Sequence, residues 1–285
     1  MEAVKSNIHT KLDSINNLPA IPEIMFDAVA AIKSDPGNVI KLSEILGKDQ
    51  AMVAKILAVA NSPLYGMLRK VSSLEFAIML MGATELQNVI TAISLSNTIS
   101  LKSNSHFNQK SYWKHSMAVG LIAKDIARNN GFTELSGEAF VAGMLHDVGI
   151  QLLVKYFAEE FEKILETESA LKSFYEAEME VLGMTHQDIG AYLLNKWELP
   201  TPLIHAVEHH HSPAFVTENT ELVSIVHLAD YIANNSSSAS GNWDKGIKLS
   251  YSIYNNIGFD NKAGLDEFIS GYSEIISETV NQLNI

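Results

Sequence analysis

The sequence predicts an all-α fold, a helical bundle divided into two helical subdomains. Apolar residues recur at spacings of three and four through most of the 285 residues, which is the pattern of amphipathic helices. Alternating patterns typical of half-buried strands are scarce. The polar stretch SLKSNSHFNQKS at 100–111 interrupts the helical pattern. We therefore expect an amino-terminal helical subdomain over 1–105 and a second helical subdomain over 106–285.

The amino-terminal part is expected to begin with a helix over 22–33. Pro22 suits a first-turn position, and the apolar residues that follow share one helix face. Asp35-Pro36-Gly37 then stops this helix. The letters NSPLYG at 61–66 predict a turn. Further helices are expected at 39–46, 50–60, 73–81 and 83–99.

The second part is expected to hold the longer series of helices. Thr185 with Asp188 three residues later approximates a capping box, and Thr201 followed by Pro202 predicts an N-cap with proline at the next position. The letters NNSSSASGN at 234–242 predict a solvated loop. The expected helices cover 111–129, 137–154, 158–168, 171–182, 186–196, 202–211, 220–234, 242–256 and 264–282.

The composition limits the cellular compartment in which we expect the protein and the metals that it could bind. A hydrophobic fraction of 47% with mixed charges is typical of a soluble globular protein. We find neither a signal peptide nor an uninterrupted apolar run of the ~20 residues that span a bilayer, so we expect a cytoplasmic protein with no membrane insertion. The chain has no cysteine. Any metal must therefore be held by imidazole and carboxylate groups, which favours iron, manganese, zinc, nickel or cobalt.

The net charge of −13 belongs to the second part of the chain. Residues 106–285 contain eleven Lys and Arg against twenty-four Asp and Glu, whereas residues 1–105 contain nine of each. Binding to a nucleic-acid duplex needs clustered basic side chains, and neither part offers such a cluster. Nucleic acid is therefore not an expected partner.

Histidine is concentrated in the second part, where nine of the ten lie between residues 106 and 227. The adjacent His146 and Asp147 end an apolar segment, FVAGMLHDVGIQLL, and two such groups are costly to bury unless they are paired. Only the interior of a bundle would bring residues so far apart in the sequence together with them. The predicted metal ligands are His115, His146, Asp147, His186, His210, His211 and Asp230. The remaining histidines, which we expect to be ordinary core or surface residues, are His9, His106, His205, His209 and His227.

The order of these residues resembles a known family. His115, the doublet His146-Asp147 and the distant Asp230 resemble the HD superfamily of metal-dependent phosphohydrolases, and this likeness implies that these four residues hold one metal ion. His186 and the pair His210-His211 resemble the extended set of the HD-GYP branch, which implies a second ion with Asp147 shared. Two such ions would polarise a phosphate and generate a hydroxide nucleophile.

The first part of the chain indicates a more specific family resemblance. The segments LPAIPEIMFDAVAAI, KILAVANSPLYG and VSSLEFAIMLMGATELQNVI resemble the amino-terminal region of HDOD proteins, the HD-related output domains of bacterial signalling. The likeness continues to about residue 235. It implies signalling proteins as partners, and we expect residues 1–105 to recognise them through the turn that carries Asn61, Ser62 and Tyr65.

Several positions depart from the catalytic pattern of the HD-GYP relatives. Ile150 stands where they carry a lysine that contacts phosphate, Ser212 replaces an acidic residue, and no Gly-Tyr-Pro loop follows. Ser111 stands where relatives with a third metal carry a carboxylate. The sequence therefore predicts a signalling regulator that retains one or two metal ions and has little or no hydrolase activity.

Two alternatives remain open. One is a metal-dependent phosphohydrolase or phosphodiesterase that acts on a nucleotide or cyclic dinucleotide, with a metal-bound hydroxide at His146 and Asp147 as the catalytic group. In that case the chain also binds a nucleotide or phosphate ligand. The other is a structural bundle in which the histidines hold no metal.

Overall fold

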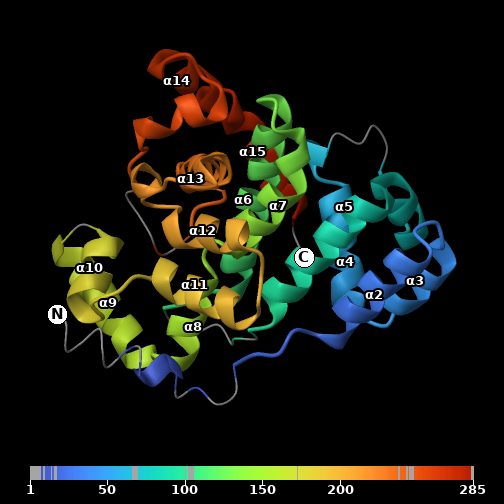
Figure 1. The fold of residues 1–285 in the computed structure, drawn as a ribbon, viewed down its shortest axis with the longest axis horizontal. Helices are drawn as coiled ribbons and strands as arrows, with labels where there is room; N and C mark the ends of the chain where they lie inside the picture. Colours follow the sequence, from blue (N-terminus) through green and yellow to red (C-terminus); the bar gives the residue numbers. More distant parts are fainter. Residues whose placement is uncertain are drawn as a thin grey trace.

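The fold is all-α, as the sequence predicts (Figure 1). The computed structural model describes residues 8, 10–13, 15, 18–65, 70–99, 101, 106–171, 173–236, 238–241, 243 and 247–283. Every regular element within these residues is helical, with no strand among them. His9, for which no metal role was expected, lies outside the described residues.

The amino-terminal helices form the right-hand lobe in Figure 1. Asn38, Asp49 and Ser73 each accept a hydrogen bond at a helix start, which explains where these short helices begin. The predicted helices at 73–81 and 83–99 form one element, α5, with a break at Gly82, whose φ of 72° is not helical. The elements are α2 (Glu23–Ser34), α3 (Val39–Leu46), α4 (Gln50–Ala60), the 3₁₀ turn η1 (Pro63–Tyr65) and α5 (Leu74–Asn97).

The remaining helices form the larger part of the molecule. Its centre is the pair α6 and α7, which pack along each other and against α5 and α13. The α-helices are α6 (Gln109–Asn129), α7 (Ser136–Leu145), α8 (Val148–Tyr156), α9 (Ala158–Leu171), α10 (Phe174–Val181), α11 (His186–Lys196), α12 (Thr201–His209), α13 (Thr220–Asn234), α14 (Lys262–Ser270) and α15 (Tyr272–Gln282). The 3₁₀ turns are η2 (Thr133–Leu135), η3 (Pro213–Phe215), η4 (Tyr251–Ile253) and η5 (Asn255–Ile257).

The prediction of a helix over 242–256 is wrong. The described residues of that range before Tyr251 are not helical, and η4 and η5 follow as short 3₁₀ turns. The backbone N–H of Ser250 donates to Nε2 of His227 at 2.9 Å instead of joining a helix. Gly258, with a φ of 81°, turns the chain after η5.

Further boundaries differ from the prediction, and one motif is confirmed. The helix expected over 264–282 is divided at Gly271 into α14 and α15. The helix expected over 137–154 ends at Leu145 and restarts at Val148, so the His-Asp doublet occupies the junction. The first turn of α12 includes Thr201, and Pro200 takes the N-cap position. The capping box of Thr185 and Asp188 is present at the start of α11.

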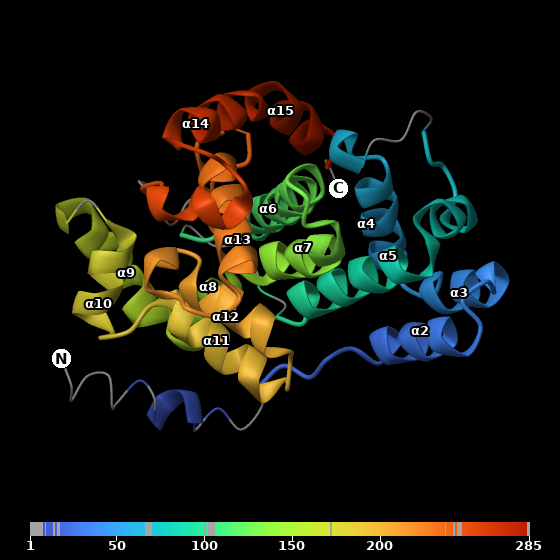
Figure 2. The ribbon, with the colours of Figure 1, turned by 45° about the horizontal axis from the view of Figure 1, so that its top comes forward.

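Contacts between the two parts of the chain are direct. Besides the packing of α5 on α7, the segment before α2 runs beneath α11 (Figure 2). There the Tyr192 hydroxyl donates to Asp13 at 2.8 Å, and the Trp197 indole donates to the Pro19 carbonyl at 2.9 Å. The boundary near residue 105 stays a prediction.

Two stretches, Leu74–Asn97 and Thr133–Tyr156, are long and apolar enough by composition to cross a membrane. Neither is one uninterrupted helix, since the first breaks at Gly82 and the second at the His-Asp doublet. The protein itself buries 44% of the most apolar window of the first and 89% of that of the second. Packing between helices thus accounts for much of their apolar character.

Candidate metal centre

The seven predicted ligands meet in one buried cluster at the meeting point of six helices. Their ring nitrogens and carboxylate oxygens form overlapping groups whose atoms lie within 4.8 Å of one another. His115 lies within α6, His146 at the end of α7, Asp147 at the start of α8, His186 at the start of α11, His210 and His211 just after α12, and Asp230 in α13.

One group forms around His115 and His146. Their Nε2 atoms are 3.3 Å apart. Oδ1 of Asp230 lies 3.2 Å from the Nε2 of His115 and 3.4 Å from that of His146. Oδ2 of Asp147 lies 3.6 and 3.2 Å from the same two atoms. These four side chains are those that the resemblance assigns to the first ion.

A second group forms on the other side of Asp147. Its Oδ1 lies 3.4 Å from Nε2 of His186 and 3.7 Å from Nε2 of His210. Nδ1 of His211 lies 3.8 Å from Oδ2 of Asp230. Asp147 thus directs one oxygen to each group, as a bridging carboxylate would. Asp230 also reaches both groups, which the sequence does not indicate.

Three of the imidazoles are fixed in orientation by backbone carbonyl groups. Because a carbonyl oxygen only accepts hydrogen bonds, Nδ1 of each ring must carry the proton, and Nε2 of the neutral ring keeps a lone pair. The Nδ1–H groups of His115, His146 and His210 donate to the carbonyl oxygens of Ala239, Gly143 and Val207 at 2.8, 2.7 and 2.7 Å.

His186 is held in the same way by a buried carboxylate, Glu178 in α10. The Glu178 carboxylate accepts hydrogen bonds from Nδ1 and from the backbone N–H of His186, all at 3.0 Å. A carboxylate behind a histidine raises its basicity and fixes its tautomer, which is a common arrangement around metal ligands. The lone pair of His186 Nε2 therefore also faces the cluster.

The buried charges of the cluster favour the binding of a cation. Burial raises the pKa of Asp147 and Asp230, but the surrounding histidines outweigh it and hold both pKa values low. Burial lowers the pKa of His146, but these two carboxylates raise it well above its usual value. Burial and neighbouring histidines lower the pKa of His210. Two carboxylates are thus kept charged in a dry interior, where protons or metal ions must neutralise them.

The residues fit metal ions. Oδ1 of Asp147 and Oδ2 of Asp230 are buried and accept no hydrogen bond from the described residues, although buried polar atoms are normally satisfied. An ion bound at roughly 2.0–2.2 Å to imidazole and carboxylate ligands holds neighbouring ligand atoms about 3.0–3.5 Å apart. Most of the distances within the cluster already lie in or near that range.

Close helix crossings bring the ligands together. A Cβ atom on Gly149 would lie 1.9 Å from the carbonyl oxygen of His186, so only glycine lets α8 approach the start of α11 this closely. Gly143 plays the same part between α7 and α6, because its Cβ would lie 2.8 Å from the Cα of Gly120. These two crossings set Asp147 against His186 and His146 against His115.

The cluster is almost closed to solvent. The side chains of six ligands are at most 1% exposed, and that of His211 is 10% exposed. The indole of Trp243 donates to Oδ2 of Asp147 at 2.6 Å, stacks on Phe107 and contacts Tyr112 in a tilted orientation. Ile150 is fully buried in the core.

The residues expected to bind a partner have internal contacts. Oδ1 of Asn61 accepts from the backbone N–H of Val71 at 2.8 Å, Ser62 is buried, and the Tyr65 hydroxyl donates to Glu85 at 2.9 Å. These contacts shape the turn after α4. Recognition of a partner by Asn61, Ser62 and Tyr65 stays a prediction.

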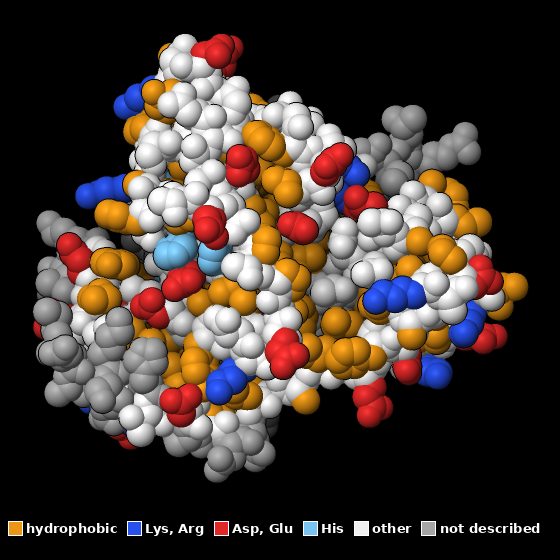
Figure 3. Space-filling view, in the orientation of Figure 1, with side chains coloured by type: hydrophobic (Ala, Val, Ile, Leu, Met, Phe, Trp, Pro, Cys, Tyr) orange, Lys and Arg blue, Asp and Glu red, His pale blue; other side chains and the backbone are white. Residues whose placement is uncertain are grey.

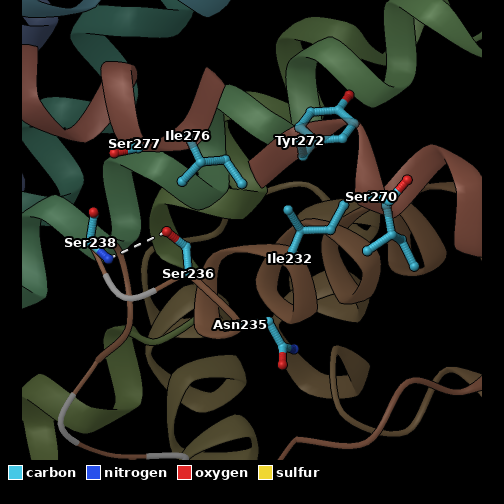
Figure 4. A pocket seen from close by; sticks show the side chains of 9 residues that line it. Ile232, Asn235, Ser236, Ser238, Ser270, Tyr272, Ile276 and Ser277 are labelled. Atoms are coloured by element: carbon cyan, nitrogen blue, oxygen red, sulfur yellow. Dashed lines mark hydrogen bonds between the residues drawn. The ribbon is translucent and has the colours of Figure 1, made fainter. Parts of the chain in front are cut away.

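A separate cavity of about 480 Å³ lies between the end of α13 and helices α14 and α15 (Figure 4). Ser236, Ser238 and Tyr272 are among its lining residues, and the Ser238 backbone N–H donates to Ser236 Oγ at 3.4 Å. No ligand of the cluster lines this cavity, so it is not an entrance to the metal centre.

Most of the chain is similar to a known protein family. The family model of the HDOD domain matches residues 18–213. An uncharacterised protein of Treponema pallidum (strain Nichols) is 24% identical over 222 residues, which are 76% of this chain but only 42% of that protein. The chain therefore corresponds to less than half the length of this curated relative.

Solved structures share the fold over the full length of the chain. An HDOD domain protein of unknown function from Geobacter sulfurreducens is 25% identical, with a TM-score of 0.79 and coverage of 100% of this chain and 99% of that one. A candidate phosphohydrolase from Shewanella amazonensis SB2B is 22% identical, with a TM-score of 0.71 and coverage of 96% and 97%. A candidate signal transduction protein from Marinobacter aquaeolei VT8 is 18% identical, with a TM-score of 0.72 and coverage of 100% and 66%.

Proposed function

The chain belongs to the HDOD family, and on that premise we propose that it is a regulatory protein of bacterial signal transduction. In this proposal its second part holds one or two divalent transition-metal ions, and it has little or no hydrolase activity. The metal serves to order the helices that meet at the cluster. Protein partners bind mainly to residues 1–105, which carry no excess charge.

The single observation that supports metal binding is the arrangement around Asp147. Lone pairs of histidine Nε2 atoms converge on its two oxygens from both sides, and hydrogen bonds behind the rings hold them there. Without a cation these lone pairs and the buried carboxylates would repel one another. Ions bound there would replace that repulsion with coordination.

Regulation is favoured over hydrolysis by the closure of the centre. A substrate phosphate needs an open coordination position and a positive group to stabilise developing charge. Here Trp243 occupies the space beside Oδ2 of Asp147, and Ile150 offers no charge. When bound, the metal would supply Lewis acidity, but the chain's own residues leave little room for a substrate beside it.

A phosphohydrolase remains the second candidate, favoured by the complete ligand set and by the bridging position of Asp147. Its substrate would be a nucleotide or a cyclic dinucleotide, and the catalytic hydroxide would lie near His146 and Asp147.

One experiment tests both functions. Untagged protein is analysed for bound metal, and melting of metal-free and metal-loaded samples is compared. We expect one or two equivalents of a transition metal and a stabilisation of about 2.7 kcal/mol when free metal is at 100 times its Kd. Asp147→Ala should lose most of this stabilisation, because its oxygens face both groups of ligands. Equal melting temperatures and no metal would contradict metal binding.

The same loaded protein is assayed with phosphomonoesters and cyclic di-GMP in the presence of manganese or iron. We expect no turnover, or very slow turnover. Efficient hydrolysis that is lost in His146→Ala would replace regulation with the phosphohydrolase function.

A further inference from the structure

The outer face of α12 carries a second group of imidazole and carboxylate side chains. His205 and His209 are four residues apart on one helix face, and their ring centroids are 6.2 Å apart. Two histidines at this spacing can chelate one transition-metal ion. Oε2 of Glu208 lies 3.7 Å from Nε2 of His209. Figure 3 shows exposed histidine and carboxylate side chains next to one another near α12.

The amide of Asn219 fixes His205. Its side-chain Nδ2 lies 2.9 Å from Nδ1 of the imidazole and donates to it, so Nε2 carries the proton of the neutral ring. An ion that binds at Nε2 must displace this proton, unlike at the buried histidines, whose Nδ1–H groups leave a lone pair on Nε2.

Exposure decreases stepwise from this set to the buried centre. The side chains of Glu208 and His209 are 39% and 31% exposed, and His211, two residues further on, is 10% exposed. The His211 ring lies 4.0 Å from the ring of His210 and 5.2 Å from that of His186, measured between centroids. The remaining six ligands are at most 1% exposed. His211 is therefore the most exposed of the seven residues of the cluster.

We infer that His205, Glu208 and His209 form an exposed capture site for divalent transition-metal ions, which loads the buried centre through His211. This inference rests on the proposed metal binding of that centre. The captured ion exchanges its water molecules for imidazole and carboxylate ligands at the surface before it enters the interior. The excess of acidic residues in 106–285 attracts cations to this part of the chain.

A purely structural role of the two half-buried histidines makes a different prediction. Histidine near a helix carboxyl end is stabilised by the helix dipole, and this accounts for the position of His209. It predicts an effect on stability but none on metal uptake. The rate of uptake therefore separates the two readings.

The test measures the rate at which full-length, metal-free protein takes up Co²⁺, followed by visible absorption after rapid mixing. At low Co²⁺ the double variant His205→Gln/His209→Gln should fill about ten-fold or more slowly than the wild type. Its final Co²⁺ content and its melting temperature once loaded should be unchanged, and excess Co²⁺ should restore the rate. Glu208→Gln should slow uptake by a smaller factor.

His106→Gln is the matched control, because His106 is 45% exposed and lies 3.9 Å from a glutamate, Glu162, away from α12. This control variant should take up Co²⁺ at the wild-type rate. Equal rates for the double variant and the wild type, or a double variant that fills at the normal rate but to a lower final content, would overturn the capture site. A wild type that binds no Co²⁺ at all would refute the proposed metal centre itself.

Discussion

At the scale of single residues, Glu178 determines how His186 faces the centre. Its carboxylate holds both Nδ1 and the backbone N–H of His186. Glu178→Gln keeps the shape but removes the negative charge that makes the imidazole a strong ligand. Losing such a partner usually lowers metal affinity by about 10–100-fold. We expect a loss of that size, measured by competition with a chelator.

Glu180→Gln, an exposed change in the same helix, is the control and should leave metal affinity unchanged. A Glu178→Gln protein with wild-type affinity would show that this carboxylate is only a structural acceptor.

The sequence identified the seven residues of the cluster but not the residues behind them. The residues of the cluster were singled out because their order resembles a known family and because buried imidazole and carboxylate groups need partners; their role as metal ligands stays a prediction. The sequence indicates Glu178 only weakly, because this residue occupies an expected apolar position on the helix face of Phe174, Ala177 and Val181. No sequence feature indicates the carbonyl of Ala239, because the identity of a residue does not reveal where its backbone points.

At the scale of elements, the crossing of α8 and α11 depends on Gly149. A methyl group at this position would meet the backbone of His186 and Gly190. Gly149→Ala must push the helices apart and move Asp147 away from His186. Overpacking of this kind costs about 1–3 kcal/mol. We expect that loss in the free energy of unfolding by urea, together with fewer bound metal ions.

The control is Gly264→Ala near the start of α14, where the nearest atom to the new methyl group would be 3.9 Å away. This variant should be as stable as the wild type or slightly more so, because alanine favours a helix over glycine. If Gly149→Ala behaved like the control, α8 would have room to move, and the close crossing would not position the ligands.

Most helices and the break at residue 82 were predicted, but the break within 137–154 was not. The range 137–154 is apolar on both sides of the doublet, so periodicity gives no reason to break it. The break arises because His146 and Asp147, although adjacent in the sequence, both face the cluster, with Nε2 and Oδ2 3.2 Å apart, whereas consecutive residues of a continuous helix point about 100° apart. The wrong helix over 242–256 has a similar cause, since Trp243 and Ser250 form contacts with Asp147 and His227.

At the scale of the whole molecule, an ion pair between a buried lysine and a half-buried glutamate joins the two parts of the chain. Glu85 in α5 is hydrogen-bonded to Lys124 of α6 and accepts from the Tyr65 hydroxyl at 2.9 Å. Nη2 of Arg128 lies 3.5 Å from Oε1 of the same Glu85 carboxylate. Lys124 is itself buried, so the loss of its partner would leave a charge without compensation.

This pair gives a pH-dependent prediction for Glu85→Gln. Burial raises the pKa of Glu85, but the hydrogen bond and charge of Lys124 outweigh it, so the pKa is lowered in the folded protein. A lowered carboxyl pKa contributes stability that is complete above the unfolded value of roughly 4.3 and is lost as pH falls through the folded value. The wild type should therefore exceed Glu85→Gln by about 1–3 kcal/mol at neutral pH, and the two should converge in acid.

The measurement is urea unfolding of metal-free protein at neutral pH and at about pH 3, so that protonation of the histidine cluster affects both proteins alike. Glu44→Gln, an exposed change in α3, should show almost no difference at either pH. Convergence in acid, with a separate unfolding step for residues 1–105 in Glu85→Gln at neutral pH, would mean that the ion pair couples the partner-binding part to the metal-binding part. A difference that persists unchanged in acid would instead assign the effect to packing, and the charge on Glu85 would then have no part in joining the two.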